Sequence, residues 1–462
     1  MTIQENGELI RDIGRFLAGR TLFSAGTNKN NELVRLIYES CRKYDVTYEA
    51  VLDNIGFEDM LEDGKGGLFR RLKDSLMGYR FENTYPERIM PFKIQDEDRE
   101  CLPWDNTLSP KRIFVEESVS ELPWTRDFLG KFTAAKVLYI KDVRDVRGKG
   151  GDDNVQRYDR RRETIYIVKN KAAFVKKCPC TKGCRGCGYW VLNIGFGCPM
   201  DCSYCYLQQY SNVDGIILPA NIEDYTPHIM GLDRDVSPGT RIGTGEFTDS
   251  LALDGYTGYS RSLMDIFRKT NNLVLELKTK SASINNILEN NEPHEHVVMS
   301  WSVNARMITE RYEKGCSSMD DRIRCMVEAA GKGFRIGLHF DPIIYYKGWE
   351  TGYSDVIREI CSRQEVLDRL AWVSLGTLRY APGLKQIAER RFCDNLIYYA
   401  GDIAEDKDGK LRYSNELREN IYRTMADLLR KGGVKSWIYL CMEFEEVCKS
   451  FRLNDFPNTV NT

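Results

Sequence analysis

The sequence predicts an α/β protein built around an incomplete barrel of parallel strands, and two observations carry this prediction. Six short, nearly uninterrupted apolar runs follow one another in the middle of the chain, and helical stretches separate most of them. Strands of this kind are typical of a parallel sheet that helices cover on both faces. Six such units form a partial (β/α)6 barrel, in which the carboxyl ends of the strands carry the chemistry. The runs are 189–195, 241–246, 272–278, 297–303, 334–340 and 371–376.

The chain on either side of these runs is predicted to form separate segments. Apolar residues recur at helical intervals in 33–44 and 67–81, which indicates a mostly helical N-terminal extension. Two strand-like runs around a helix, from 111 onward, indicate a small α/β lead-in, and the C-terminal end combines a helix with a short strand. The predicted division is 1–110, 111–188, 189–385 for the barrel, and 386–462 for the mixed C-terminal segment.

Composition limits the classes of protein to consider. The chain has 462 residues with 42% hydrophobic and 29% charged residues, as expected for a globular protein with a large core. The net charge of −2 gives no general preference for a polyanion. No apolar run reaches the roughly 18 residues of a membrane span, and the N-terminus lacks the pattern of a signal peptide. The 15 cysteines are therefore expected to be reduced thiols and metal ligands in a cytoplasmic protein.

Three cysteines with C-x3-C-x2-C spacing form the most informative motif. Cys198, Cys202 and Cys205 lie in GFGCPMDCSYCYLQQY, directly after the first predicted barrel strand. Three thiolates can hold three irons of a [4Fe–4S] cluster and leave the fourth iron open to chelate S-adenosylmethionine (SAM). A structural zinc site is the alternative, but it usually needs four ligands, and no histidine is nearby in the sequence. The spacing resembles the signature of the radical SAM superfamily.

Longer stretches of the chain resemble the spore photoproduct lyase family within that superfamily. The resemblance covers residues 113 to about 425 and is carried by CSYCYLQ, RIGTGEFTDSLALD, WSVNARMITERYEKGCSSMDDRI, YYKGWETGY and LRYAPGLK. It implies a radical SAM barrel whose cluster reductively cleaves SAM to a 5′-deoxyadenosyl radical, which abstracts hydrogen from a substrate. It further implies an external reductant such as flavodoxin or ferredoxin, and it raises the prospect of DNA repair with DNA as a partner.

The chain departs from the family at one important position. Photoproduct lyases use a cysteine to return a hydrogen atom to the repaired thymine, but the end of the second barrel strand here carries Glu246. The O–H bond of a carboxylic acid is strong, so that Glu246 is a poor hydrogen-atom donor. Glu246 instead resembles the acid that holds the amino group of the SAM methionine by a charge-assisted hydrogen bond. A salt bridge at the barrel rim is the alternative for Glu246. Cys316 is a candidate substitute donor.

The resemblance also assigns other candidate site residues at strand ends. Lys280, Ser302 and Asn304 correspond to family positions near the carboxylate or ribose of the cofactor, although Ser and Asn also cap helices. Arg379, just past the sixth strand, suits a phosphate or carboxylate, with a surface salt bridge as the alternative. The candidate catalytic residues are Tyr204 and Tyr206, which flank Cys205 and could relay a hydrogen atom or pack the loop, and Asp341 at the end of the fifth strand.

A second group of cysteines precedes the barrel. Cys178, Cys180, Cys184 and Cys187 occur within ten residues of KKCPCTKGCRGCGYW. Such a compact quartet can wrap one metal, and either zinc or a second iron–sulfur cluster fits. A chance enrichment of reduced cysteines is the alternative.

A basic stretch from Arg144 to Lys177 interleaves arginines and lysines with Tyr158 and Tyr166. This mixture suits a phosphate backbone, whereas a solvated surface is the alternative. Two other functions stay compatible with the sequence. One is a radical SAM enzyme that acts on a peptide, nucleoside or metabolite with an auxiliary cluster. The other is a nucleic-acid-binding protein that metal stabilises and that has no catalytic activity. The sequence does not determine the oligomeric state.

Overall fold

The computed structural model describes most of the chain and divides it into two compact units. One unit comprises Met1–Pro103, Ile344–Lys347 and Leu378–Arg418, and the other comprises Trp104–Ile343, Gly348–Thr377 and Glu419–Thr462. The described residues are 3–20, 27–63, 66–81, 108–146, 154–171, 174–211, 213–290, 292–392, 396–401, 403–449 and 459–460. The predicted linear division into four segments stays a prediction beside these two units.

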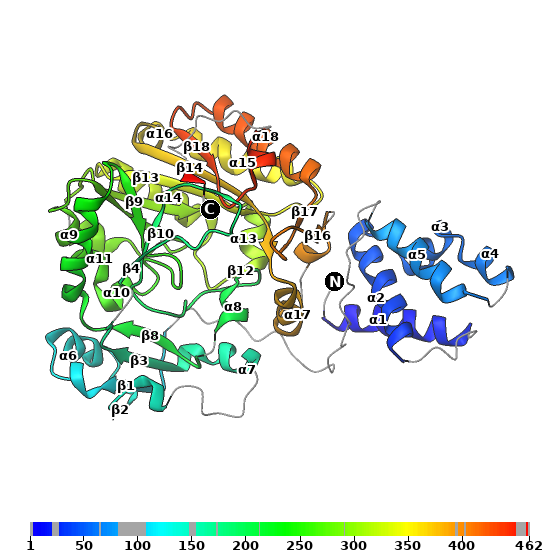
Figure 1. Cartoon of the computed structure of the whole chain (residues 1–462), viewed down its shortest axis with the longest axis horizontal. Coiled ribbons are helices and arrows are strands. Elements are labelled where there is room, and N and C mark those ends of the chain that lie inside the picture. The colour runs from blue at the N-terminus through cyan, green and yellow to red at the C-terminus, as the bar shows by residue number, and fades with distance from the viewer. Residues whose placement is uncertain are drawn as a thin grey trace. The chain divides into compact units, whose positions relative to one another are not determined.

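The larger unit contains a curled eight-stranded sheet (Figure 1). Seven of its strands are parallel, and β4 is antiparallel at one edge. The six predicted strands are all present in sequential order, which confirms the α/β barrel fold. In spatial order the strands are β18 (Trp437–Leu440), β14 (Leu370–Thr377), β13 (Arg335–Ile343), β11 (Val297–Ser302), β10 (Leu273–Thr279), β9 (Thr240–Gly243), β6 (Trp190–Leu192) and β4 (Val175–Lys177).

Burial explains why the strand sequences are almost continuously apolar. Every residue of β11 is buried, and so are six of the seven residues of β10. Helices cover the outer face of the sheet, as a parallel sheet requires (Figure 1). The helices that follow the strands include α9 (Thr226–Asp235), α11 (Tyr259–Phe267), α12 (Asn285–Asn290), α13 (Arg306–Tyr312), α14 (Met319–Gly331), α15 (Trp349–Cys361), α16 (Gln364–Arg369) and α18 (Asn415–Lys431).

Helix α14 shows how local sequence sets such an element. The Ser318 side chain accepts a hydrogen bond of 3.1 Å from the backbone N–H of Asp321, so that it caps the start of the helix. Ile323, Met326 and Ala330 then recur at helical spacing and are buried. The helix therefore begins at a polar cap and presents one apolar stripe to the core.

A second, four-stranded parallel sheet precedes and follows the cysteine loop in the sequence. Its order is β2 (Lys136–Ile140), β1 (Arg112–Glu116), β3 (Thr164–Val168) and β8 (Ile216–Pro219), with α6 (Pro123–Gly130) between β1 and β2. The two strands predicted around a helix are thus confirmed. The backbone of Phe196 pairs with that of Ile217 on β8, which links this sheet to the segment that leads into the cysteine loop.

The two ends of the barrel sheet approach each other through a hairpin. Residues 178–189 connect β4 to β6 at one edge of the sheet, and residues 441–444 follow β18 at the other edge. The backbone of Cys184 forms a β-bridge with Phe444, and the N–H of Arg185 donates a 2.9 Å hydrogen bond to the carbonyl of Glu443. The short strand predicted near the C-terminus is therefore β18, an edge strand of the barrel.

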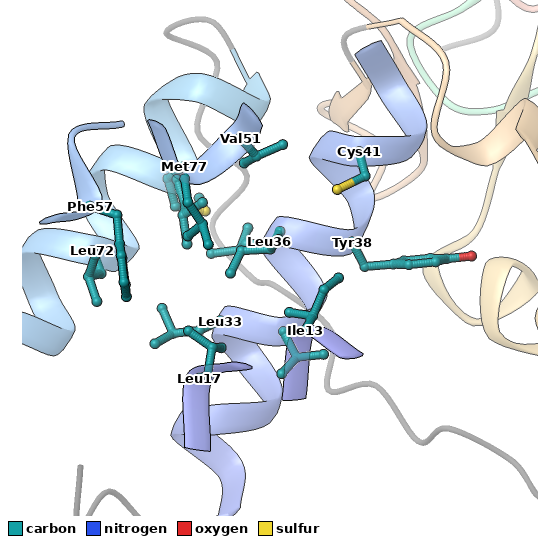
Figure 2. Packing of buried hydrophobic residues seen from close by; sticks show 14 of the residues in the cluster. Ile13, Leu17, Leu33, Leu36, Tyr38, Cys41, Val51, Phe57, Leu72 and Met77 are labelled. Atoms are coloured by element: carbon teal, nitrogen blue, oxygen red, sulfur yellow. The ribbon is translucent and has the colours of Figure 1, made fainter. Parts of the chain in front are cut away.

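The smaller unit begins with five helices around their own apolar core (Figure 2). Ile13 and Leu17 pack with Leu33 and Leu36 of the second helix and with Met77 of the fifth. This confirms the helical prediction for the described part of 1–110, whereas 82–107 lie outside the described residues. The helices are α1 (Ile3–Gly19), α2 (Thr27–Tyr44), α3 (Tyr48–Asn54), α4 (Phe57–Glu62) and α5 (Leu68–Phe81).

The same unit contains a buried group of charges. The Glu39 carboxylate accepts from the Lys385 ammonium at 2.7 Å and from the Arg80 guanidinium at 3.3 Å, and Arg35 also pairs with it. This unit further contains β15 (Arg379–Tyr380), β16 (Ile403–Glu405), β17 (Leu411–Tyr413) and α17 (Pro382–Arg391). Among the helices that the structure describes, none is long and apolar enough to span a membrane.

Candidate active site at the cysteine loop

The loop with Cys198, Cys202 and Cys205 follows β6, at the carboxyl end of the first parallel strand of the barrel. Cys202 belongs to the short strand β7 (Asp201–Cys202), which pairs antiparallel with β12 (Glu313–Lys314). Cys202 is buried, and Cys198 and Cys205 are partly exposed. The loop therefore bridges the first strand of the barrel and the segment after β11.

Arg161 holds the backbone of this loop through hydrogen bonds to two of its carbonyl groups. Its guanidinium donates to the carbonyl of Cys198 at 2.8 Å and to the carbonyl of Met200 at 2.5 Å. It also pairs with the Asp201 carboxylate at 3.4 Å and lies 3.9 Å from the centre of the Tyr158 ring. Arg161 is 1% exposed, so these are charged hydrogen bonds in a water-free setting, where they are strong. The fork of Arg161 thus determines the path of the loop.

Gln208 holds the other half of the loop. Its side-chain amide donates to the carbonyls of Cys202 at 3.0 Å and of Ser203 at 3.1 Å. The N–H of Ser203 donates to the carbonyl of Tyr312 at 2.8 Å, which extends the β7–β12 pairing. Gln208 is wholly buried. Its amide satisfies carbonyls that would otherwise be unpaired in the turn.

A buried carboxylate, Glu313, organises the polar side chains behind the loop. Its oxygens accept from the Arg322 guanidinium at 2.6 Å and from the Tyr204 hydroxyl, and the Lys280 ammonium lies 3.9 Å away. Burial alone would raise the pKa of Glu313, but Arg322 and Lys280 lower it to about 2. Burial alone would lower the pKa of Lys280, but Glu313 raises it above its ordinary value. Both groups are therefore charged at neutral pH.

The predicted residues Ser302 and Asn304 contribute to this same buried network. The Asn304 amide donates to Glu313 at 3.3 Å and to the carbonyl of Pro342 at 3.2 Å, and it accepts from the Tyr353 hydroxyl. The carbonyl of Ser302 accepts from Arg322 at 3.0 Å. Neither side chain caps α13, because the residue at its cap position is Ala305. Their predicted contacts with the cofactor stay predictions.

Tyr206 and Glu246 meet at the mouth of the barrel. The hydroxyl of Tyr206 donates to the backbone carbonyl of Glu246, and Tyr206 is 42% exposed. The Glu246 carboxylate pairs with the Lys176 ammonium of β4 at 2.8 Å. The salt bridge that the sequence left as an alternative for Glu246 is thus present, whereas Glu246 still lies beside the exposed tyrosine of the cysteine loop. Tyr204, in contrast, is buried in the Glu313 network.

Asp249 is a positioning residue that the sequence did not reveal. One carboxylate oxygen accepts from the N–H groups of Leu251 and Ala252, each at 2.9 Å, and from the Thr279 hydroxyl at 2.6 Å. The other oxygen accepts from the N–H of Lys280 at 2.7 Å. Asp249 thereby joins the loop after β9 to the end of β10. The hydrogen bond from the N–H of Lys280 to Asp249 thus fixes the backbone at Lys280.

The remaining strand-end residues take different positions. His339 is buried, and its Nε2 lies 2.6 Å from the Glu276 carboxylate, so it has the structural role expected of most lone histidines. Asp341 lies on β13 and is partly exposed. Arg379 lies on β15 in the smaller unit, and its predicted contact with a phosphate or carboxylate stays a prediction.

Part of the basic stretch is buried and so forms neither a surface for phosphate nor a solvated surface. Arg161, Tyr158 and Tyr166 are each 1% exposed, and Arg161 faces the cysteine loop. Tyr166 donates to the Asp214 carboxylate at 2.5 Å and stacks on Phe114. These three residues are unable to contact a nucleic acid backbone. Residues 147–153 and 172–173 of the stretch lie outside the described residues.

The donor set of the loop fits an iron–sulfur cluster. The loop offers three thiols. Burial and the neighbouring Cys202 thiol raise the pKa of the Cys205 thiol to about 11, and the positive charges of Arg161 and Lys280 act against this rise. Positive groups at this place favour thiolates, the form that binds iron. Across the described ranges, no three His, Cys, Asp or Glu side chains already converge on a single metal ion. Three ligands for three different irons have no need to converge in this way.

Cys316 lies next to this donor set. Its sulfur is 3.5 Å from that of Cys202, because the turn after β12 returns toward β7. It therefore lies beside Cys202 of the loop and not at the end of the second strand. In the second cysteine group, the sulfurs of Cys178 and Cys180 lie 3.5 Å apart, whereas the Cys184 thiol donates to the carbonyl of Met442 at 3.4 Å.

Comparisons with known proteins agree with this geometry. The model of the spore photoproduct lyase family matches residues 108–428. A spore photoproduct lyase of Geobacillus sp. (strain Y412MC61) is 24% identical over 300 residues, which are 61% of this chain and 82% of that protein. The spore photoproduct lyase of Bacillus subtilis (strain 168) is 23% identical over 260 residues, which are 55% of this chain and 74% of that protein.

Solved structures show the same fold. A spore photoproduct lyase complexed with dinucleoside spore photoproduct superposes with a TM-score of 0.62 at 22% identity, over 72% of this chain and 99% of that chain. A double mutant of spore photoproduct lyase with bound AdoMet and dinucleoside spore photoproduct gives a TM-score of 0.62 at 22% identity, over 72% and 98% of the two chains. All five N-terminal helices, α1 to α5, lie outside the residues that the family model matches.

Proposed function

The chain belongs to the spore photoproduct lyase family of radical SAM enzymes, and on this premise we propose that it repairs spore photoproduct in DNA. The observation that carries the proposal is the cysteine loop, which is held after the first barrel strand by Arg161, Gln208 and the β7–β12 pairing. The relatives are named for this lesion, and three of the matched solved structures contain its dinucleoside form. The proposed substrate is thus a thymine lesion in DNA.

We propose that Cys198, Cys202 and Cys205 hold a [4Fe–4S] cluster with SAM at its open iron. When bound, this pair supplies the 5′-deoxyadenosyl radical. The residues of the chain bind the cluster and SAM, orient them, and shield them from water. Arg161 and Gln208 fix the loop backbone, and the Glu313 network excludes water behind it because its members are buried. Lys280 and Glu246 are proposed to face the carboxylate and the amino group of the SAM methionine, respectively.

The first experiment separates catalysis from metal binding. The protein is reconstituted anaerobically with iron and sulfide, reduced with dithionite, given SAM and an oligonucleotide that contains spore photoproduct, and assayed for 5′-deoxyadenosine and restored thymines. Both products are expected. Cys202→Ala is expected to abolish both, because the cluster loses one of three ligands. Retention of SAM cleavage by this variant would contradict the ligand assignment. SAM cleavage without thymine restoration would favour a peptide, nucleoside or metabolite substrate, and no cleavage would favour a non-catalytic protein.

The assignment of Glu246 is tested separately. Glu246→Gln is expected to weaken SAM binding by about tenfold, as the loss of a charged hydrogen bond of about 1.5 kcal/mol implies, and to leave the iron content unchanged. The measurement is equilibrium binding of SAM to the reconstituted protein. Unchanged affinity would leave Glu246 only its ion pair with Lys176. We further propose that the family's donor cysteine is absent, since Glu246 stands at the end of the second strand, and that another group returns the hydrogen atom.

Several partners are proposed with this function. A one-electron reductant such as flavodoxin or ferredoxin would reduce the cluster, and the cytoplasm is the compartment that keeps these thiols reduced. We also propose that the four-cysteine group at 178–187 participates in binding a metal, since two of its thiols already lie 3.5 Å apart.

A further inference from the structure

Two exposed aromatic rings lie in contact directly beyond the last cysteine of the loop. Tyr206 precedes and Tyr210 ends the short helix α8 (Leu207–Tyr210), and they are 42% and 59% exposed. Their ring centres are 6.0 Å apart, because one helical turn separates the two residues. Single exposed aromatic residues are normal on a protein surface, whereas two in contact form a small apolar patch. In the described part of the chain, the other large hydrophobic side chains with comparable exposure are Val46, Tyr139 and Trp437.

The two rings, which we call the tyrosine pair, are attached to the mouth of the barrel. The hydroxyl of Tyr206 donates to the backbone carbonyl of Glu246, in the loop after β9. Leu207 and Gln208 are buried and anchor α8. The exposed side of the helix therefore carries Tyr210, and the tyrosine pair continues from the mouth onto the surface of the same compact unit.

The geometry of the tyrosine pair leaves ring surface for a further partner. The two ring planes meet at 71°, so the edge of one ring meets the other, and such a contact covers one face of one ring. Tyr206 is held by its hydroxyl, whereas Tyr210 has the larger exposed fraction. Proteins that bind single-stranded DNA stack bases on exposed rings of this kind, and every base has a face that stacks. The tyrosine pair thus suits a flat nucleobase.

Positive charge lies next to the tyrosine pair. Helix α7 (Asn154–Asp159) lies against α8 (Figure 1). Val155 and Tyr158 of α7 are each 1% exposed, so this side of the helix faces inward. Gln156 and Arg160 are four positions apart and exposed, so they lie on the solvent side. Arg160 therefore carries its guanidinium at the surface, beside the helix that ends at Tyr210.

The exposed charge around Arg160 is mostly positive, although the chain as a whole carries a net charge of −2. Arg157 and Arg162 are partly exposed as well. The acids of the same segment are Asp159, which is exposed, and Glu163, whose carboxylate accepts from a lysine in an ion pair of 2.9 Å. A positive surface beside stacking rings is the combination with which proteins hold the backbone and the bases of single-stranded DNA.

A thymine lesion that reacts inside a barrel must leave the base stack of the duplex. Enzymes that extrude a nucleotide in this way lose its stacking and pairing energy. The bases on either side of the extruded nucleotide lose a stacking partner at the same time. An aromatic ring at the mouth of the barrel replaces that partner, and a guanidinium group beside it suits the phosphate of the same strand.

We propose that Tyr210 stacks on a nucleobase that flanks the lesion, with Arg160 at a phosphate of the same DNA strand. Tyr206 holds the ring of Tyr210 edge to face and keeps it beside the mouth. The strand is unpaired where it meets Tyr210, and the contact is tolerant of base identity. The inference rests on the proposed repair of DNA and names the part of the DNA, beyond the lesion, that this chain holds.

Equilibrium binding of a labelled single-stranded thymine oligonucleotide to the reconstituted full chain tests the stacking contact. Tyr210→Ala is expected to bind about tenfold more weakly, which is about 1.4 kcal/mol, whereas Tyr210→Trp should keep the affinity of the wild type because it keeps an aromatic face. A wild type that does not bind the oligonucleotide, or a Tyr210→Ala variant that binds it as tightly as the wild type, would overturn the proposal.

Tyr139→Ala is the matched control for Tyr210→Ala. Tyr139 is 60% exposed, almost the same fraction as Tyr210. It lies on β2, at the opposite edge of the four-stranded sheet from β8, the strand that follows α8. The control should bind the oligonucleotide as the wild type does. An equal loss in both variants would show that any exposed tyrosine contributes, and would overturn the assignment of Tyr210.

Arg160→Met tests the phosphate contact. This variant is expected to weaken binding and to reduce the slope of the logarithm of affinity against the logarithm of salt concentration by about 0.7, the value for one phosphate of a single strand. An unchanged slope would overturn the assignment of Arg160.

Dinucleoside spore photoproduct separates this inference from the proposed function. It has no flanking base, so Tyr210→Ala and the wild type should bind it equally, and a tenfold loss would place Tyr210 at the lesion itself and overturn the flanking contact. Restoration of thymine from this ligand by the wild type tests repair without any flanking base. Repair without Tyr210-dependent binding of the oligonucleotide would reject only this inference, and Tyr210-dependent binding without repair would reject only the proposed function.

Discussion

Replacement of Arg161 by methionine tests how the protein holds its cysteine loop. Methionine keeps most of the side-chain volume but removes the guanidinium fork. The variant loses the hydrogen bonds to the carbonyls of Cys198 and Met200 and the ion pair with Asp201. It leaves these acceptors buried, because Arg161 is 1% exposed. The expected effect therefore combines lost bonds with uncompensated polar groups.

The magnitude follows from these contacts. A hydrogen bond from a charged donor contributes about 1.5–3 kcal/mol, and the two loop carbonyls accept one each. Removing one partner of a buried ion pair costs about 3–5 kcal/mol, although this overlaps with the lost hydrogen bonds. We expect Arg161→Met to lower the free energy of unfolding by about 4 kcal/mol. The loop should be affected first, so that iron leaves the reconstituted protein faster than from the wild type.

Two measurements check this expectation under anaerobic conditions. Urea unfolding followed by tryptophan fluorescence gives the free energy, and the rate at which a chelator removes iron reports on the loop. Arg160→Met is the matched control, because Arg160 is the exposed neighbour in the sequence and its loss should change stability by less than about 0.5 kcal/mol. If Arg161→Met unfolds and releases iron as the control does, the loop is held by other contacts and the reasoning is wrong.

Two other predictions concern buried charges in the barrel. Glu313→Gln leaves the Arg322 guanidinium without its carboxylate and should lower the free energy of unfolding, measured in urea, by about 3 kcal/mol. The control Glu310→Gln changes an exposed residue and should have almost no effect. Equal urea midpoints for the two variants would refute this prediction. Burial lowers the pKa of His339 below its ordinary 6.5, so the unfolded state binds a proton first as pH falls, and stability should decrease below about pH 6.5. Glu276, whose pKa burial would raise but His339 lowers, should add a further loss near and below its ordinary 4.5. The free energy of unfolding, measured in urea at several pH values from 7.5 to 5.5, should therefore depend less on pH in His339→Gln than in the wild type. An equal dependence on pH in the two proteins would contradict the assignment.

The strands of the barrel could be predicted because each is a local pattern. Val297–Ser302 and Leu273–Thr279 are apolar along their length since both faces of the sheet are covered. The cysteine loop was equally readable, because its three ligands lie within eight residues. The sequence of Trp437–Leu440 predicts a strand, but it does not show that this strand pairs at the edge of the barrel sheet, because a strand sequence does not specify a partner far away in the chain.

The residues that support the loop were harder to recognise for a related reason. Arg161 occurs in a run of charges, and such runs are usually solvated, so nothing local marks the one arginine that is buried. Glu313 follows the fourth strand by eleven residues, and its partners Tyr204 and Lys280 come from other segments. Asp249 lies in the same loop as Glu246, yet its role depends on backbone N–H groups, which every residue type except proline offers.

The bridge between Cys184 and Phe444 also has a consequence for synthesis of the chain. The two residues are 260 positions apart, so the chain must be synthesised as far as Phe444 before this contact can form. At the usual 5–20 residues per second, a ribosome needs roughly 13–52 s to extend the chain from one to the other. During that interval the segment at Cys184 and Arg185 lacks its backbone partners Phe444 and Glu443, and chains with unpaired edges of this kind aggregate. Yield in the cell should therefore depend on chaperones more strongly than final stability suggests.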